Sequence, residues 1–257
     1  MGLSAGLLTV AAACVIFSVF VVDTQSSATM RRSEEAALSK SSVFTLNWAP
    51  AFCKTDPENE GCSSGRLARL GDQLIIHGLW PQPYENDYCE VPEKEKLAAE
   101  HGHLDQLPPV DIAQPMFDRL LPHYSRKENL AYEWLKHGSC SGVGQDEYFE
   151  DIEDLFGQVS GVLEPLFRDA AGGMLKVETI QEKLDATLGH RAGSRFKLVC
   201  GKAHGISGDV IVEAELSLPR VEDLRRDGAL KPLKDLLTHA PRIEAGCPEG
   251  LVVASES

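Results

Sequence analysis

Two short segments of the sequence carry side chains suited to acid–base chemistry. The first is LIIHGLWPQ, from Leu74 to Gln82, in which three aliphatic residues precede His77. The aliphatic run predicts a buried strand that delivers His77 to its end, because Gly78 and the Trp80–Pro81 pair are expected to turn the chain. A strand end is a common position for a catalytic imidazole, although a single histidine there more often has a packing role.

The second segment is YEWLKHGSC, from Tyr132 to Cys140. If it is helical, Glu133 and His137 are four residues apart and Lys136 is three residues from Glu133, so carboxylate, ammonium and imidazole share one face. The glycine after His137 provides a helix stop. An isolated string of this kind is usually a surface ion pair. Here the flanking tryptophan and cysteine indicate partial burial, which favours a functional cluster.

Two histidines with a carboxylate and a lysine form a set suited to RNA cleavage. A base takes the proton from the ribose 2′-OH, an acid protonates the departing 5′-oxygen, and cations hold the charge on the phosphorus-bound oxygens. Histidine suits both roles, because its pKa of about 6.5 allows one imidazole to be neutral while the other is protonated. The attacking hydroxyl belongs to the substrate, so no metal ion or other cofactor is required, and DNA cannot react.

Two other kinds of protein could carry these residues. A metallohydrolase could use His77, Glu133 and His137, but the H-E-x-x-H pattern expected of such an enzyme does not occur in the sequence. A catalytically silent binding or interaction protein would normally have lost one of the two histidines, and this chain keeps both. An assay in a chelator separates the three hypotheses.

Both segments, in this order, resemble the active-site motifs of the ribonuclease T2 family, the secreted acid endoribonucleases. The matching strings are IHGLWPQ and EWLKHGSC, LNWAPAFC resembles the family's opening strand, and the likeness runs with gaps from about residue 43 to residue 247. The resemblance implies an α+β fold with a central antiparallel sheet flanked by helices. It also implies transphosphorylation of RNA to 2′,3′-cyclic phosphates, which are then hydrolysed to 3′-phosphates.

The resemblance assigns a role to each candidate catalytic side chain. His137 is the base on the 2′-OH, His77 is the acid for the leaving oxygen, and Glu133 with Lys136 stabilises the pentacovalent phosphorus. Trp80 lines the base pocket, although a tryptophan beside proline is commonly a core residue.

One position departs from the family pattern. Many family members carry a further histidine just before the glutamate of the second motif, and this chain has Tyr132 there. A phenol can donate a hydrogen bond to phosphate but brings no charge. The departure affects the binding of phosphate and leaves the four catalytic positions intact.

Charge and the first residues indicate the kind of protein. The formal net charge of −14 argues against a protein that coats nucleic acid through a broad basic surface. The run from Ala5 to Val22 contains no charged residue and predicts a signal peptide over residues 1–28, or an uncleaved anchor. A linker is expected over residues 29–42 and one ribonuclease domain over residues 43–257. We expect a secreted or periplasmic monomer that binds RNA and contacts a membrane only if the anchor remains.

Six cysteines remain after Cys14, which lies in the signal segment, is set aside. An even number in an exported chain predicts disulfides, and no C-x-x-C pair supports a zinc site. Proximity in sequence favours Cys53 with Cys62. The last two strands and the tail favour Cys200 with Cys247, which the family resemblance also implies. Cys89 with Cys140 then remains, joining the loop after His77 to the end of the helix that carries His137.

The pattern of apolar residues predicts the elements that must position this chemistry. Strands are expected at residues 43–48, 75–77, 195–200 and 208–218, the last two as an antiparallel pair. Helices are expected at residues 146–167 and 177–189, and a short helix interrupted by prolines at residues 110–124. Strands and helices do not alternate regularly, so the expected fold class is a single disulfide-stabilised α+β domain.

Overall fold

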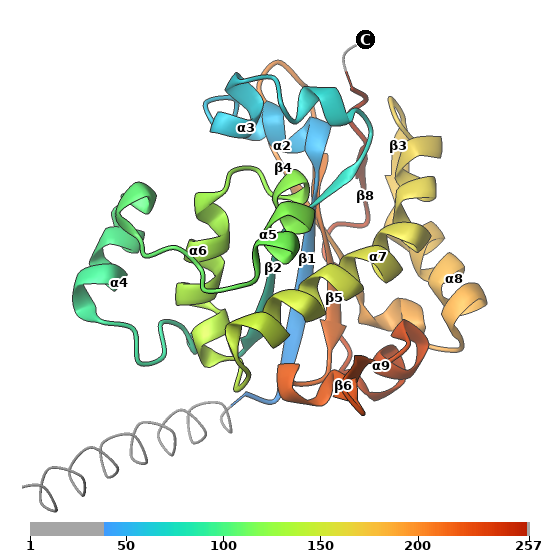
Figure 1. The fold of residues 1–257 in the computed structure, drawn as a ribbon. Helices are drawn as coiled ribbons and strands as arrows, with labels where there is room; N and C mark the ends of the chain where they lie inside the picture. The colour runs from blue at the N-terminus through green and yellow to red at the C-terminus, as the bar shows by residue number, and fades with distance from the viewer. Residues whose placement is uncertain (1–38, 256–257) are drawn as a thin grey trace, which may run out of the picture.

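The chain folds around one central sheet, with helices at both ends of the molecule (Figure 1). The structure is a computed structural model that describes residues 39–255, so the expected signal segment and most of the expected linker lie outside the described residues. Six strands form the sheet in the order β2-β1-β5-β8-β3, and β4 also pairs with β5. The strands are β1 Ser41–Trp48, β2 Leu74–Gln82, β3 Met174–Lys176, β4 Phe196–Gly201, β5 Val210–Leu218 and β8 Glu249–Leu251.

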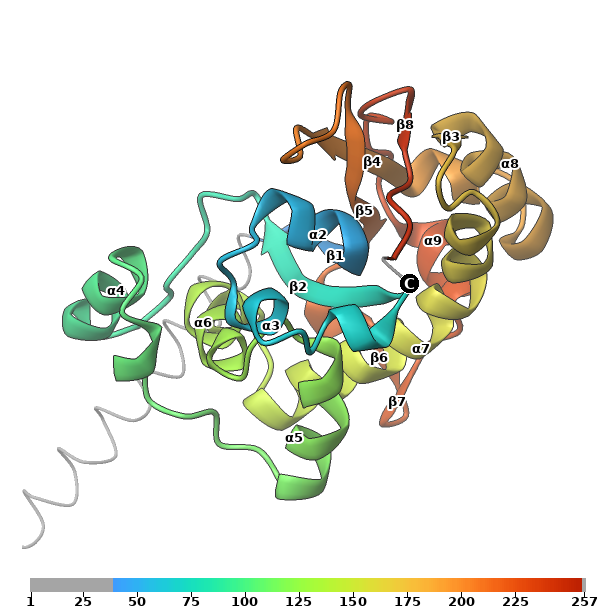
Figure 2. The same ribbon diagram turned by 90° about the horizontal axis from the view of Figure 1, so that it is seen from above.

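Helices cover one face and both ends of this sheet, which confirms the α+β class. In Figures 1 and 2, α4 and α6 lie at one end of the molecule, α8 and α9 lie at the other, and α7 crosses between them. The helices are α2 Ala49–Thr55, α3 Glu60–Ser63, α4 Glu93–Glu100, α5 Gln114–Leu120, α6 Glu128–Lys136, α7 Gln145–Asp169, α8 Val177–Leu188 and α9 Leu233–His239. No helix in this described part is both long and apolar enough to cross a membrane.

Most of the predicted elements are present, and the differences concern their ends. The two expected long helices correspond to α7 and α8, and the expected antiparallel pair corresponds to β4 and β5. The first strand begins at Ser41, two residues before the boundary expected at Val43. Two parallel contacts also occur in the described residues, between Val210 of β5 and Leu251 of β8 and between Leu198 of β4 and Gly246.

The first strand shows how the sheet separates a core face from a polar face. Phe44 and Trp48 are fully buried in the main core, and the Trp48 ring lies 5.2 Å from the ring of Phe167 on α7. Thr45 and Asn47 alternate with them and therefore point to the opposite face. Because β2 and β5 flank β1 on either side, side chains from these two strands can meet over this polar face. His77 of β2 and Glu213 of β5 do so.

The predicted turn after His77 is wrong, because β2 continues to Gln82. Trp80 pairs with Val43 and Pro81 pairs with Ser42, so the ladder runs well past the histidine. Proline removes one backbone donor, which an edge strand tolerates because its outer side needs no ladder bond. Since β2 is the first strand of the sheet order, a proline within it does not end the strand.

Three disulfides close the described structure in the predicted pairing. They join Cys53 to Cys62, Cys89 to Cys140 and Cys200 to Cys247, with Cα–Cα distances of 5.4, 5.1 and 6.0 Å. All three distances lie in the ordinary range for a disulfide.

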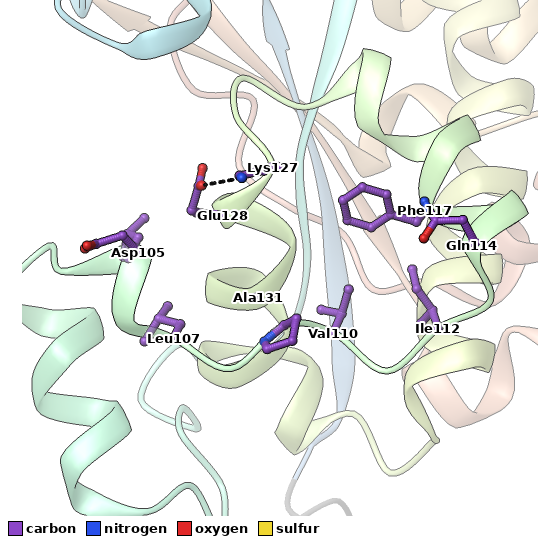
Figure 3. Close-up of a pocket in the computed structure, with 11 residues that line it drawn as sticks. Asp105, Leu107, Val110, Ile112, Gln114, Phe117, Lys127, Glu128 and Ala131 are labelled. Atoms are coloured by element: carbon purple, nitrogen blue, oxygen red, sulfur yellow. Dashed lines mark ion pairs between the residues drawn. The ribbon is translucent and has the colours of Figure 1, made fainter.

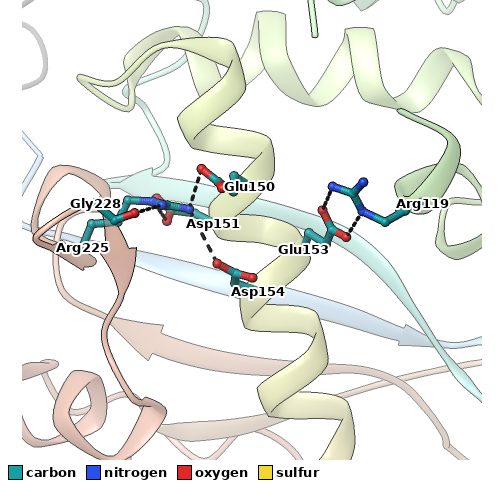
Figure 4. Close-up of polar contacts among 7 residues, drawn as sticks. All are labelled: Arg119, Glu150, Asp151, Glu153, Asp154, Arg225 and Gly228. Atoms are coloured by element: carbon teal, nitrogen blue, oxygen red, sulfur yellow. Dashed lines mark hydrogen bonds and ion pairs between the residues drawn. The ribbon is translucent and has the colours of Figure 1, made fainter. Parts of the chain in front are cut away.

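A charged cluster on α7 fixes the small hairpin formed by β6 Arg225–Arg226 and β7 Ala229–Leu230 (Figure 4). The Arg225 guanidinium contacts Asp151 at 2.7 Å and Glu150 at 3.0 Å, and it donates to the Gly228 carbonyl at 2.7 Å. Asp151 is fully buried, and burial raises its pKa to about 7 even though the Arg225 charge opposes the shift. We call this group, together with Asp154 at 3.6 Å from Arg225, the Arg225 cluster.

Candidate active site

A β-bulge in β2 presents His77. Thr45 of β1 pairs with Gly78 and Leu46 pairs with Ile76, so His77 is an extra residue without a partner across the ladder. A bulge of this kind bends the strand and changes the direction of a side chain. The His77 side chain remains 37% exposed, whereas the residues paired on either side of the bulge are all buried.

Helix α6 presents the second set of side chains. It ends at Lys136, and the amide of His137 donates to the carbonyl of Glu133 at 3.0 Å, so both residues occupy one side of the final turn. Glu133 is 2% exposed and His137 is 5% exposed. The predicted helix and the sharing of one face by these two residues are therefore present in the structure.

The close approach of α6 to β2 depends on Gly78. A Cβ atom at this position would lie 2.1 Å from Oε2 of Glu133 and 2.5 Å from Nε1 of Trp80. The same two atoms are joined by a hydrogen bond of 2.9 Å, in which the indole N–H of Trp80 donates to the carboxylate. The glycine thus leaves room for the carboxylate to reach the strand.

Trp80 contacts both candidate histidines. Its ring lies 4.8 Å from the His77 ring in an edge-on geometry and 5.3 Å from the His137 ring in a tilted one. Trp80 is 8% exposed, while Tyr84, whose ring is 5.8 Å away, is 46% exposed. Tyr84 therefore presents more open aromatic surface beside the histidines than Trp80 does.

Lys136 and Tyr132 form a pair at the edge of the site. The Lys136 ammonium donates to the Tyr132 hydroxyl at 3.1 Å and lies 5.4 Å from the centre of its ring. Burial alone would lower the pKa of Lys136, but the Tyr132 hydroxyl and the charge of Glu133 outweigh it and raise the pKa. The lysine is therefore a fixed cation.

The surroundings of the two histidines shift their pKa values in opposite directions. Burial would lower the pKa of His77, but a hydrogen bond to Glu213 and the charges of Glu133 and Glu213 outweigh it, so the pKa is raised. Burial lowers the pKa of His137 to about 3, and the charges of Lys136 and His77 lower it further. The surroundings thus favour the protonated form of His77 and the neutral form of His137.

Glu133 is a buried carboxylate whose charge has several partners. Burial raises its pKa, and the charge of His77, the Trp80 hydrogen bond and the charge of Lys136 oppose that shift. A raised pKa in a buried group that interacts with the charges of both a histidine and a lysine is typical of functional clusters.

The Cys89–Cys140 disulfide connects the two halves of this site. Cys89 follows β2 and Cys140 follows α6, and the residue before Cys89 donates its amide to the Lys136 carbonyl at 2.9 Å. The bridge closes a loop of 51 residues. In the chain-entropy treatment a loop of this length corresponds to about 4 kcal/mol of stabilisation.

Two residues at the site were not predicted from the sequence. Glu213 of β5 lies 2.7 Å from Nδ1 of His77, and Tyr84 lies beyond the strand that holds Trp80. Glu213 and Glu215 alternate with apolar residues in the predicted strand, which indicated a polar face, but nothing in the sequence indicated that β5 lies near β2.

A cavity of about 470 Å³ lies on another side of α6 (Figure 3). Its walls include Leu107, Val110 and Phe117, with Glu128 and Lys127 at one end, and none of the candidate catalytic side chains lines it. Within residues 39–255, no group of three His, Cys, Asp or Glu side chains is arranged to hold a metal ion. The candidate catalytic side chains therefore lie apart from this cavity.

Comparison with known proteins places this geometry in context. Residues 39–216 match the model of the Ribonuclease T2 family. Intracellular ribonuclease LX from Solanum lycopersicum is 25% identical over 151 residues, which cover 57% of this chain and 61% of the relative. A ribonuclease from Aeromonas hydrophila is 28% identical over 113 residues, which cover 44% of this chain and 43% of the relative. The match thus spans only part of each relative's length.

Solved structures share the fold over a larger part of the chain. A mutant of RNase MC1 in complex with 5′-GMP superposes with a TM-score of 0.54, covering 83% of this chain and 99% of that structure at 20% sequence identity. At this identity the likeness describes the fold alone.

Proposed function

The chain belongs to the ribonuclease T2 family, and from this premise we propose that it is an endoribonuclease that cleaves single-stranded RNA without a metal ion. The observation that carries the proposal is the placement of two imidazoles against the Trp80 ring, in surroundings that raise the pKa of His77 and lower that of His137. Acid–base catalysis needs one group that accepts a proton and another that supplies one, and environments that separate two pKa values assign these roles.

In the first step the ribose 2′-oxygen attacks phosphorus. Neutral His137 takes the 2′-OH proton, a bond forms between the 2′-oxygen and phosphorus, and the bond from phosphorus to the 5′-oxygen breaks. Protonated His77 gives its proton to the departing 5′-oxygen, which leaves a 2′,3′-cyclic phosphate. In the second step His77 takes a proton from a water molecule, whose oxygen forms a bond to phosphorus while the bond from phosphorus to the 2′-oxygen breaks. His137 returns its proton to the 2′-oxygen, and the product is a 3′-phosphate.

Fixed charges stabilise the pentacovalent phosphorus. Lys136 is held by Tyr132 and is a permanent cation beside Glu133, so the pair can bind the equatorial oxygens as charge accumulates there. Tyr132 acts on phosphate through Lys136 as well as through its own hydroxyl. Trp80 forms the inner wall of the base pocket, and the more exposed Tyr84 provides its outer stacking surface.

The substrate and the location follow from the same chemistry. DNA lacks the attacking hydroxyl and is excluded as a substrate. Three disulfides are typical of an oxidising compartment, so we assign the protein to the secreted or periplasmic space, as a monomer. The proposed N-terminal signal over residues 1–28 provides the route, and the ribonuclease domain follows the linker.

The test is an assay of the purified protein on single-stranded RNA in the presence of EDTA. We expect cleavage with transient 2′,3′-cyclic ends, and no cleavage of the DNA strand of the same sequence. Loss of activity in the chelator would favour a metallohydrolase. Absence of turnover with retained RNA binding would favour a catalytically silent binding protein.

A further inference from the structure

Glu213 lies outside both active-site segments but makes the shortest polar contact to His77. Its carboxylate oxygen is 2.7 Å from Nδ1 of the imidazole, and its side chain is 18% exposed. The residues are 136 positions apart in the sequence. With Nδ1 occupied, the second ring nitrogen is the one that can face a substrate, and within the described residues no hydrogen bond to it is found.

The contact spans three strands and therefore depends on the arrangement of the whole sheet. His77 is on β2 and Glu213 is on β5, and β1 lies between them. Two strand spacings of about 4.8 Å separate the backbones, so both side chains must extend over β1 to meet. Asn47 of β1 stands directly opposite Glu213, and Thr45 pairs with the residue after His77. These short side chains leave room for the contact above β1.

The charges around His77 come from two sides. Glu213 faces it from β5, and Glu133, Lys136 and His137 face it from the end of α6. Lys136 opposes protonation of His77, and the two carboxylates favour it. His137 has no carboxylate contact among the described interactions, and its pKa falls. The hydrogen bond to Glu213 is thus the largest of the influences that favour protonation of His77, and His137 has no counterpart to it in the described part of the chain.

We propose that Glu213 is the positioning residue of the acid: it accepts a hydrogen bond from Nδ1 of His77, orients the ring, and keeps the other nitrogen protonated toward the leaving oxygen. The acid role rests on the function proposed above. Removing the charge would lower the pKa of His77 in a merely structural ion pair as well, but only a positioning role would move the alkaline limb of the rate profile with it. The two readings therefore differ in a property that can be measured directly.

The experiment compares Glu213→Gln and Glu213→Ala, with Glu215→Gln as the matched control. Glutamine keeps an oxygen that can accept from Nδ1 but removes the charge, and alanine removes both. Glu215 is two residues along the same face and pairs with Lys197 at 3.0 Å instead. The readouts are an NMR titration of His77, the pH dependence of kcat/KM on a dinucleotide substrate, and thermal melting to establish that each variant is folded. Glu213→Asp replaces any variant that does not fold.

The expected result is a lower His77 pKa in Glu213→Gln, with the alkaline limb of the rate profile moved to lower pH by the same amount. Activity at neutral pH should fall about tenfold in Glu213→Gln and further in Glu213→Ala, because general acid catalysis needs both the proton and its direction. The control should titrate like the wild type. An unchanged His77 titration in a variant of an active wild type would overturn the positioning role alone. A wild type that cleaves no RNA would overturn the proposed function. The NMR titration of His77 would still report its interaction with Glu213.

Discussion

The histidine site and the Arg225 cluster both bury a carboxylate beside cationic groups, but they differ in what the charges can do. In the first, Glu133 meets a titratable imidazole that remains 37% exposed. In the second, Asp151 meets a guanidinium that never loses its proton and whose side chain is only 11% exposed. A solvent-accessible imidazole that can gain and lose a proton suits proton transfer. A buried guanidinium with a permanent charge suits the attachment of the β6–β7 hairpin to α7.

The comparison predicts that the histidines matter for rate and not for stability. His77→Ala and His137→Ala should each lower kcat by a factor of about 10² to 10⁴, which is the usual contribution of a positioned acid or base. The double variant should be little worse than either single one, because both groups serve the same step. Steady-state kinetics on a dinucleotide substrate and thermal melting measure the two effects.

The control for the histidine variants is His101→Ala, which removes an exposed imidazole far from both motifs in sequence. Its kinetics should match those of the wild type. Independent, multiplicative losses in the double variant would contradict the assignment of acid and base to one step.

The Arg225 cluster should show the reverse behaviour. Arg225→Ala leaves Asp151 buried without its cation, and breaking a buried pair in this way costs about 3 kcal/mol. The free energy of unfolding, measured in urea at pH 8, should fall by this amount, while kcat/KM at a permissive temperature stays unchanged. Arg119→Ala is the control, because Arg119 pairs with Glu153 on the same helix but is largely exposed (Figure 4). A loss of activity in folded Arg225→Ala would contradict the conclusion that the Arg225 cluster contributes to stability and not to catalysis.

The same cluster fixes the sign of a pH effect on stability. The pKa of Asp151 is raised to about 7 from its ordinary value of 3.8, so between these values the folded state binds more protons than the unfolded state. The contribution of this group to stability therefore falls as pH rises through that window. The loss caused by Arg225→Ala should be smaller at pH 5 than at pH 8, because a protonated Asp151 no longer requires a cation.

The sequence predicted the grouping of the candidate side chains on α6 because their spacing is local. Glu133, Lys136 and His137 lie within one helical turn, so spacing alone places them on one face. Proximity in sequence predicted Cys53 with Cys62. The last strands and the tail, together with the family resemblance, predicted Cys200 with Cys247, and Cys89 with Cys140 followed as the remaining pair. The α6 side chains are close together in the chain, and six cysteines leave few possible pairings.

The remaining features depend on contacts across the sheet, which no local pattern contains. Glu213 reaches His77 only because β1 separates β2 from β5 in the strand order. The continuation of β2 through Pro81 follows from its place at the sheet edge. Turn signals in the sequence are identical for a strand that ends and for an edge strand that continues, so the wrong turn followed from missing topology.

A substitution at Gly78 tests the position of the Glu133 carboxylate without changing any of the proposed catalytic residues. Gly78→Ala keeps every proposed catalytic residue type but adds a Cβ atom where only 2.1 Å separates it from Oε2 of Glu133. The far end of the glutamate must move, which disturbs its bond to Trp80 and its place beside Lys136. We expect kcat to fall about tenfold with a small change in KM, because electrostatic stabilisation acts mainly in the transition state.

The matched control for Gly78→Ala is Gly157→Ala on α7, where the added Cβ would meet nothing within 4 Å. Alanine is favoured over glycine inside a helix by about 1 kcal/mol, so this variant should melt at a higher temperature with unchanged kinetics. Gly78→Ala, in contrast, should show a lower rate and a lower melting temperature, because the added Cβ also meets Nε1 of the buried Trp80 ring at 2.5 Å. An equal rate in the two variants would mean that the Glu133 carboxylate does not need its observed position. The role of Glu133 as a stabiliser of the phosphorus would then fall, while those of the two histidines would stand.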